Sequence, residues 1–472
     1  MRKLSETALG TAKDAAAMMA FLILAAVMLS WVALYNQAPL VFSDTLTYAM
    51  SAYQREMPGF FSIFYSAYIL PLHRGISFWP VVFVQGAMLA HVLFLTARCV
   101  SDHRVTMVEL LAIVGALSVF SSLPWLTGQI LPDVFTPVLL LGMFLLAFCS
   151  ARLGRWELAY VWGLTTASIT THLSHVPIAI GLAAICMICQ PLLGPKRSRL
   201  RNVSAMLVTS CAAAICMMLA ANWVSSRQLV FARNSSAFLL AKWIDEGPAL
   251  WYLTDACASE RYALCAHLEQ LKDLSHDELK WAESSPLKKV GSFDELEPEA
   301  RRIVGATLRS YPFQIFGRAI LDAGAQLLRV QAGDGLVPNF ATFVGYHLGI
   351  LFGADVGDVF IQSRQARGEL PVTGARALHL VGLLFGIVSW VCAIVVLGSG
   401  LPKRQLALYA VVCVGILWNG MVTGALSGPH DRYLARVIWL LCFIGLLGAS
   451  AHRVHLNWRP SRTGRSSLGN GP

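Results

Sequence analysis

The sequence is poor in charged residues for its length. Of 472 residues, 14% are Asp, Glu, Lys or Arg and 56% are hydrophobic, with a mean hydropathy of +0.59. Those values exclude an ordinary soluble globular protein and a disordered chain, and they indicate a polytopic membrane protein. The net charge of +10 fits the basic cytoplasmic loops of such proteins. We therefore expect no nucleic-acid partner.

Apolar runs close to the roughly 20 residues that a bilayer requires predict an all-α protein with about ten transmembrane helices. Two of them, the third and the fifth, are short for a full crossing. The ten runs are Ala15–Leu34, Phe78–Ala97, Thr106–Leu123, Val134–Ala151, Leu158–Thr171, Val176–Leu193, Val203–Val224, Leu378–Leu397, Leu406–Ala425 and Leu434–Ala451.

Basic residues orient this bundle, because Lys and Arg concentrate on the cytoplasmic side. They gather before the first span, after every second span and in the C-terminal tail, so both termini are expected in the cytoplasm. The first span has no small-residue cleavage site and is expected to be an uncleaved anchor. The localisation that follows is a bacterial inner membrane, crossed many times, with the lipid bilayer as one partner. The basic residues include Arg2, Lys3, Lys13, Arg98, Arg104, Arg152, Arg155, Lys403, Arg404, Arg453 and Arg459.

The spans divide the chain into four parts. Residues 1–224 form an N-terminal bundle of about seven spans, and residues 225–377 form one periplasmic insertion long enough for a small domain. Residues 378–452 add about three spans, and 453–472 form a basic cytoplasmic tail. The insertion lacks sustained period-two alternation, so it is expected to be mainly helical, with breaks near Gly247–Pro248 and at Pro312. Its apolar part, 336–352, is interrupted by proline and glycine and predicts an interfacial or re-entrant segment, with a full crossing left open.

Nine of the eleven cysteines lie in spans or on the cytoplasmic side, where small apolar packing is their usual role. Cys257 and Cys265 differ, because both fall in the periplasmic insertion. Their separation of eight residues and an oxidising compartment predict a local disulfide. The alternative is a pair of buried thiols.

Two acidic residues lie on the outer face. Asp44, in "LVFSDTLTYAMSAY", follows the first span, and Asp133, in "TGQILPDVFTPVLL", stands at the outer mouth of the fourth. Either carboxylate could simply favour a helix start. A carboxylate at a membrane surface can also have a raised pKa suited to general-base catalysis.

His172 and His175, in "TTHLSHV", lie at the turn between the fifth and sixth spans on the same side. A spacing of three places both rings on one helical face. With one or two Asp they could bind zinc or manganese, but hydrogen bonding to a substrate is favoured over a metal. The alternative is a pair of simple structural hydrogen-bonding residues.

The stretch "SGPHDRYLARV" stands between the last two spans and holds His430, Asp431, Arg432, Tyr433 and Arg436. An arginine fork suits a phosphate or carboxylate, and tyrosine suits the interface. The structural alternative is an internal charge cluster, in which Asp431, Arg432 and Arg436 pair with one another. Because the other polar groups share this face, phosphate recognition is slightly favoured.

These motifs carry a resemblance. An Asp just after the first span in "SDTLTY", a later outer acid, a large periplasmic insertion and "HDRYLARV" before a late span resemble the GT-C superfamily of membrane glycosyltransferases, which use polyprenyl-phosphate-linked sugars. The proline that often follows the late Arg-Tyr pair is missing here. One acid stands in the first loop where many members have two, so no metal cofactor is expected. "GALSGPHDRYLARVIWLL" with "YALC" also resembles an uncharacterised proteobacterial inner-membrane protein family.

The resemblance implies a transfer of sugar from a polyprenyl-phosphate donor to a cell-envelope acceptor. Asp44 would be the general base, and Arg432 would hold the lipid phosphate with help from His430 or Tyr433. The remaining outer-face residues, Asp133, His172 and His175, would line the acceptor or sugar pocket.

Three other functions stay open: a transporter, an O-antigen ligase or polymerase, and a non-catalytic assembly subunit. Transporters usually bury ionisable groups near the midplane and often contain inverted repeats. Here the span interiors are nearly free of charge, and the sequence shows no internal repeat.

Overall fold

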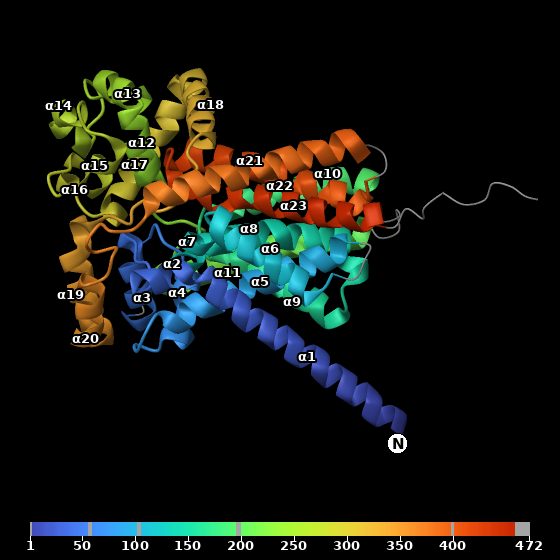
Figure 1. Cartoon of the computed structure of the whole chain (residues 1–472). Coiled ribbons are helices and arrows are strands. Elements are labelled where there is room, and N and C mark those ends of the chain that lie inside the picture. The colour runs from blue at the N-terminus through green and yellow to red at the C-terminus, as the bar shows by residue number, and fades with distance from the viewer. Residues whose placement is uncertain (1, 55–58, 102–104, 195–199, 398–400, 458–472) are drawn as a thin grey trace, which may run out of the picture.

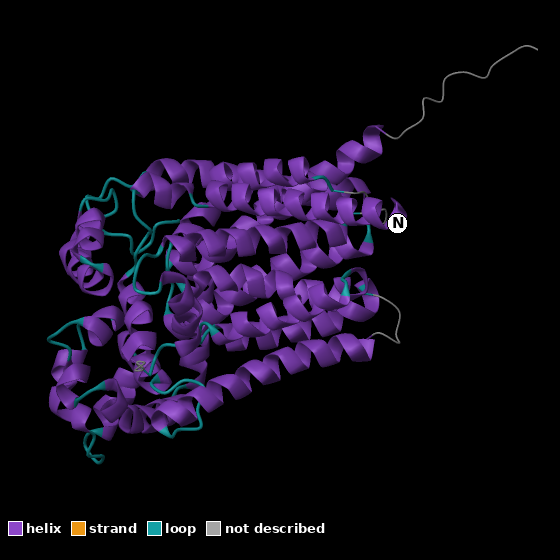
Figure 2. Cartoon of the chain, turned by 90° about the horizontal axis from the view of Figure 1, so that it is seen from below, coloured by secondary structure: helices purple, strands orange, loops and turns teal. Residues whose placement is uncertain are grey.

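A computed structural model describes residues 2–54, 59–101, 105–194, 200–397 and 401–457. Over these residues the chain folds into helices and loops without a strand (Figure 2). The nearest approach to a sheet is a single bridge between Leu40 and Gln129. The expected all-α class is therefore confirmed.

Seven helices among the described residues are long and apolar enough to cross a membrane. They confirm a multi-pass membrane protein, while the count of about ten stays a prediction. The seven are Trp79–Val100, Pro132–Arg152, His175–Leu193, Arg201–Ser226, Val372–Val395, Lys403–Ser427 and Asp431–Ala449. In helix labels these are α5 (Trp79–Val100), α8 with its flanking turns (Phe135–Phe144), α10 (His175–Leu193), α11 (Leu200–Ser226), α21 (Val372–Leu397), α22 (Lys403–Ser427) and α23 (Asp431–Asn457).

The other three expected spans correspond to helices that depart from the predicted lengths. The predicted first span is divided, because α1 (Arg2–Leu29) ends before α2 (Trp31–Asn36) begins. Helix α6 (Met107–Phe120) has 14 residues and is about 21 Å long at 1.5 Å per residue. Helix α9 (Arg155–Thr170) has 16 residues. A hydrocarbon core is about 30 Å thick, so neither α6 nor α9 alone matches a full crossing.

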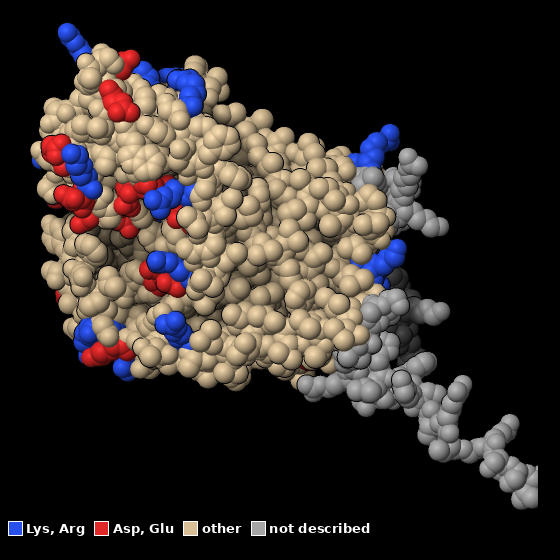
Figure 3. Space-filling model, turned by 90° about the horizontal axis from the view of Figure 1, so that it is seen from above, with Lys and Arg blue, Asp and Glu red and all other residues tan. Residues whose placement is uncertain are grey.

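The long helices lie side by side with α6 and α9, and the helices of residues 235–361 lie at one end of this bundle (Figure 1). The start of α1 lies at the opposite end of the bundle. On the face drawn in Figure 3, charged side chains gather toward the two ends and leave a broad neutral belt between them. Lipid can cover this belt without an unpaired charge entering the hydrocarbon core, where it would be costly. The end that carries the insertion is called the outer end below, following the predicted orientation.

The insertion folds around a small core of its own. Leu240, Leu253, Leu264 and Ile303 are all fully buried in that core. The elements are α12 (Ser235–Asp245), α13 (Pro248–Ala256), α14 (Leu268–Leu271), α15 (His276–Trp281), α16 (Pro286–Val290), α17 (Phe293–Ser310) and α18 (Pro312–Leu327). Lys242 pairs with Glu246 and with Asp322, and the second pair joins α12 to α18.

Proline and cysteine positions organise this insertion as the sequence predicts. Helix α13 begins at Pro248, and α18 begins at Pro312 directly after α17, because proline fits a first helical turn but not a helix interior. Cys257 and Cys265 are disulfide-bonded, with their Cα atoms 5.6 Å apart.

The segment 336–352 forms part of a short helical hairpin. Helix α19 (Ala341–Phe352) has 12 residues and packs on α20 (Ala354–Ile361). The two backbones touch, since a Cβ on Gly357 would lie 2.4 Å from the carbonyl oxygen of Gly345. At about 18 Å, α19 is too short to cross a bilayer, which favours the interfacial or re-entrant alternative over a full span. Its exposed Phe343, Tyr346 and Ile350 suit a lipid interface.

Candidate functional site

The first outer loop presents Asp44 at the start of helix α3 (Ser43–Gln54). Thr45 fixes the turn, because its hydroxyl donates to the carbonyl of Ile130 at 2.9 Å and accepts from the amide of Phe42 at 3.0 Å. The Asp44 carboxylate accepts from the Ser43 hydroxyl at 3.2 Å. Its other charged neighbour comes from the far end of the sequence.

That neighbour is Arg432, in the first turn of α23. Its Nη1 lies 3.6 Å from Oδ2 of Asp44, and the two side chains are 20% and 25% exposed. The guanidinium carbon lies 4.5 Å from the ring centre of Phe42 and 4.9 Å from that of Tyr433, so the cation is held by two aromatic faces. Nη2 also donates to the Tyr433 hydroxyl at 3.2 Å. The structure thus brings together three predicted site residues, Asp44, Arg432 and Tyr433.

The surroundings of Asp44 act on its pKa in opposite directions. Burial raises the pKa of the carboxyl above its ordinary value, and the Arg432 guanidinium opposes part of that rise. The negative charge of Asp133 adds to the rise. A carboxyl with a raised pKa is a better proton acceptor than an ordinary surface aspartate.

The end of α18 and the segment after it hold the loop in place through hydrogen bonds between side chains and backbone groups. Gln326 accepts from the amide of His430 at 2.9 Å and donates to its carbonyl at 2.8 Å. The Asp431 carboxylate accepts from the amide of Gln331 at 2.9 Å, and Asp334 accepts from the amide of Arg432 at 3.1 Å. Asp431 and the two arginines of this loop therefore find different partners instead of the internal cluster considered as an alternative.

Asp133 and Arg436 form a sealed ion pair beneath this loop. Arg436 Nη1 lies 2.7 Å from Asp133 Oδ1, and the side chains are 0% and 6% exposed. Nη2 donates to Asn419 at 2.8 Å and to the Ser174 hydroxyl at 3.4 Å. Asp133 was a predicted site residue, whereas Arg436 was expected only as a possible member of the internal charge cluster. The signal was its position inside an apolar helix, since a charge there marks a pair or a functional site.

The two predicted histidines of the outer turn differ in their burial and in their hydrogen-bond partners. His175 is fully buried, with one ring nitrogen 2.8 Å from the Thr136 hydroxyl and the other 2.7 Å from the Ser168 carbonyl. His172 is half-buried, and its Nδ1 lies 2.8 Å from the Ser174 hydroxyl. Burial lowers the pKa of His172 to about 3, so the ring is neutral at pH 7. Through Ser174 this neutral ring connects to the Arg436 pair.

His430 lies apart from those two, with its ring 5.5 Å from the ring of Tyr433 and 6.0 Å from that of His276. Across the described ranges, one group of His, Cys, Asp or Glu has ligand atoms close enough for a shared ion: His276, Asp277 and His430. That group includes neither His172 nor His175.

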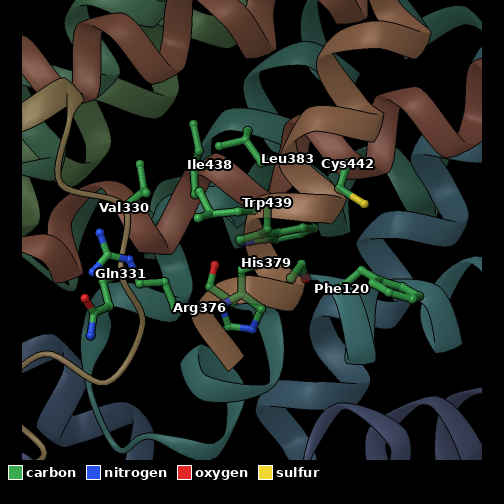
Figure 4. Close-up of a pocket in the computed structure, with 12 residues that line it drawn as sticks. Phe120, Val330, Gln331, Arg376, His379, Leu383, Ile438, Trp439 and Cys442 are labelled. Atoms are coloured by element: carbon green, nitrogen blue, oxygen red, sulfur yellow. The ribbon is translucent and has the colours of Figure 1, made fainter. Parts of the chain in front are cut away.

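A separate cavity lies between α6, α21 and α23 (Figure 4). It is lined by residues that include Phe120, Arg376, His379 and Trp439 (Figure 4). With a volume of ≈ 20 Å³ it has room for roughly one water, and none of its lining residues is a predicted site residue. A larger cavity of ≈ 260 Å³ lies between the first outer loop and the α19–α20 hairpin, with Trp79, Asp355 and Phe360 in its wall.

Comparison of the chain with family models, with curated proteins and with solved structures finds no match.

Proposed function

We propose that the chain is a membrane glycosyltransferase of the GT-C type, which moves a sugar from a polyprenyl-phosphate carrier to an acceptor on the outer side of a bacterial inner membrane. One observation carries the proposal: Asp44 and Arg432 meet at 3.6 Å at the outer end of the bundle. In the roles that the GT-C resemblance implies, Asp44 is the general base and Arg432 binds the lipid phosphate.

The geometry of Arg432 suits a phosphate that arrives from the membrane. The ring contacts with Phe42 and Tyr433 use none of the guanidinium's hydrogen-bond donors, and the hydrogen bond to the Tyr433 hydroxyl uses Nη2. The contact with Asp44, at 3.6 Å, is longer than a charge-assisted hydrogen bond of about 2.7–2.9 Å. The singly charged phosphodiester of the donor would therefore compete for the fork, and the second charge that develops on the leaving polyprenyl phosphate would bind it more strongly.

Phosphate binding would also activate Asp44. Arg432 lowers the pKa of this carboxyl, so a phosphate that neutralises the guanidinium removes part of that effect. The pKa of Asp44 then rises further, and the carboxylate becomes a stronger base. Binding of the donor and activation of the acceptor are thereby linked at a single ion pair.

The reaction balances with these two groups. Asp44 takes the proton of the acceptor hydroxyl, whose oxygen forms a bond to the anomeric carbon from the face opposite the leaving group. The bond between that carbon and the phosphate oxygen breaks, and the electron pair leaves with polyprenyl phosphate, stabilised by Arg432. Asp133, His172 and His175 would support the pocket from beneath, while His430 and Tyr433 flank the phosphate.

The test is the consumption of a polyprenyl-phosphate-linked sugar in membranes that contain each variant at matched expression. Arg432→Lys retains the charge but loses the planar fork, and Asp44→Asn retains the shape but loses the base. We expect each to reduce turnover by about 100-fold or more, because the loss of an acid–base or electrostatic group typically costs at least about 100-fold.

Two control variants lie on the same outer face. Arg364 also stacks on a ring, 4.3 Å from the centre of Tyr35, and pairs with Glu369 at 3.9 Å. Asp358 is an exposed carboxylate on α20. Arg364→Lys and Asp358→Asn should leave turnover near the wild-type level. If the turnover of Asp44→Asn and Arg432→Lys equalled that of these controls, the pair would have only a structural role. The glycosyltransferase proposal would then be rejected.

A further inference from the structure

A second group of polar side chains lies where the insertion meets the loop before α23. His276 and Asp277 open helix α15 of the insertion, and His430 comes from the loop between α22 and α23. One ligand atom from each of these three residues lies within 4.8 Å of the others. The distance from His276 Nε2 to Asp277 Oδ1 is 3.6 Å.

His276 is already oriented as a metal-binding histidine would be. Its Nδ1 lies 3.0 Å from Oδ2 of Asp245, which also accepts from the backbone amide of His276 at 2.9 Å. Because Asp245 accepts from Nδ1, a neutral His276 ring would carry its lone pair on Nε2. A carboxylate behind a ligating imidazole is a recurring second layer of metal sites.

The other ring nitrogen of His276 makes no hydrogen bond within the described part of the fold. Nε2 is buried and has no hydrogen-bond partner, although buried polar atoms are nearly always paired. It faces Gly428, where an added Cβ would lie 3.0 Å from Nε2 and where φ is +95°. A side chain at Gly428 would therefore crowd Nε2, and glycine leaves that space free.

We propose that His276, Asp277 and His430 bind a divalent transition-metal cation of the zinc class, with Asp245 as the residue that orients His276. Two imidazoles and one carboxylate suit Zn²⁺, whereas Mg²⁺ and Ca²⁺ prefer sites made of oxygen atoms. Three protein ligands leave a fourth position for water. This site does not depend on the proposed sugar transfer.

Binding requires small movements of the side chains. Ligand atoms around zinc, at bonds of about 2.0–2.1 Å, lie roughly 3.5 Å from one another, so the three groups must close in slightly. Asp277 is 50% exposed, and its Oδ1 also lies 2.9 Å from Nζ of Lys280. The cation would displace or share this contact. His430 is held more firmly, since Gln326 binds both its amide and its carbonyl.

The consequence of the site is a connection between two parts of the chain. The cation would join α15 of the insertion to the loop that carries Arg432 two residues later. Metal binding would therefore stabilise the folded chain as a whole, by an amount that grows with the ratio of free metal to Kd.

The experiment uses the full chain in detergent, purified through a tag without histidine and stripped with a chelator. Zn²⁺ alone is titrated, with bound zinc measured by mass spectrometry and the melting temperature measured in parallel. We expect one zinc per chain and a higher melting temperature. His276→Gln and His430→Gln should abolish both effects, and Asp245→Asn should weaken binding by about 10- to 100-fold, the usual effect of removing such an outer partner.

His347→Gln is the matched control, because this histidine on α19 bonds only within its own helix, to the carbonyl of Phe343 at 2.9 Å. It should bind zinc like the wild-type chain. Asp277→Asn, a half-exposed change that the fold should tolerate, should weaken binding even if the histidine variants fail to fold. A stripped wild-type chain that takes up no zinc would overturn the proposal, as would equal zinc binding by the wild-type, Asp277→Asn and His276→Gln chains.

Discussion

The carboxylate of Asp133 and the guanidinium of Arg436 are 2.7 Å apart, in a place where neither side chain is more than 6% exposed. One residue precedes α8 and the other lies in the second turn of α23, so the pair joins two long helices near their outer ends. Asn419 and Ser174 accept the remaining donors of the fork. A buried charge pair is tolerated when its hydrogen-bonding groups are satisfied in this way.

Arg436→Met should therefore be strongly destabilising, because it leaves Asp133 as an uncompensated buried charge. The expected loss is about 3–5 kcal/mol, seen as a lower melting temperature and poor recovery in detergent. Adding Asp133→Asn to Arg436→Met should restore part of that loss. Arg98→Met, which breaks an exposed pair with Glu157, should cost about 1 kcal/mol or less. Simple addition of the two single losses in the double variant would contradict this account.

The stability of the protein should depend on pH through Asp44. Its folded-state pKa is raised by burial, so its contribution to stability is present below the unfolded pKa and is lost as pH rises through the folded pKa. Asp44→Asn removes the ionisation. The melting temperature of this variant should exceed that of the wild-type chain by more at pH 7–8 than near pH 4. A difference that shrinks as pH rises would show that the Arg432 pairing outweighs burial.

The transfer activity should also depend on pH through Asp44, because a general base must be ionised to accept a proton. Turnover should rise with pH through the folded pKa of Asp44. Arg432→Gln removes a charge that lowers this pKa, so the acidic limb of the residual activity should move to higher pH. An unchanged profile would argue that Asp44 is not the proton acceptor.

The disulfide between Cys257 and Cys265 should be intact in membranes prepared with an alkylating agent. Its two Cα atoms are 5.6 Å apart, within the range that a disulfide spans. Cys257→Ser should lower stability by about 2–3 kcal/mol, the loop-closure value for a short loop. Cys216→Ser, which removes an exposed free thiol on α11, should have little effect. Alkylation of both Cys257 and Cys265 in the native chain would show that they are reduced.

The orientation of the bundle can be tested with reporter fusions. A reporter after Trp251, in α13, should be active only as a periplasmic enzyme, whereas one after Gly194, at the end of α10, should be active only as a cytoplasmic enzyme. Both results follow from the basic residues that mark alternate loops. Cytoplasmic activity after Trp251 would reverse the predicted topology.

Local features of this fold were predictable because they depend on neighbouring residues. Long apolar runs indicated the membrane helices, Pro248 and Pro312 marked helix starts, and the spacing of Cys257 and Cys265 indicated their disulfide. Helix ends were less predictable. Helix α1 ends at Leu29 and not at Leu34, and α21 begins at Val372 and not at Leu378, although hydropathy indicated the later residue in both cases.

Contacts between distant segments could not be deduced in this way. Nothing near Asp44 in the sequence indicates that Arg432 is its partner, and the same holds for Asp133 with Arg436. The shared outer face only permitted such encounters. His276 was not singled out at all, because its neighbours resemble an ordinary exposed turn and its relation to His430 exists only after α15 packs against the loop.

The Asp44–Arg432 pair has a consequence for how the protein is made. Asp44 and Arg432 are 388 residues apart in the sequence, so a ribosome must synthesise all of that stretch before the two can meet. Until α23 is inserted, Asp133 also lacks its arginine. A prematurely terminated product would therefore have neither the assembled pair nor a neutralised interior, and membrane proteases could recognise it before it engages any ligand.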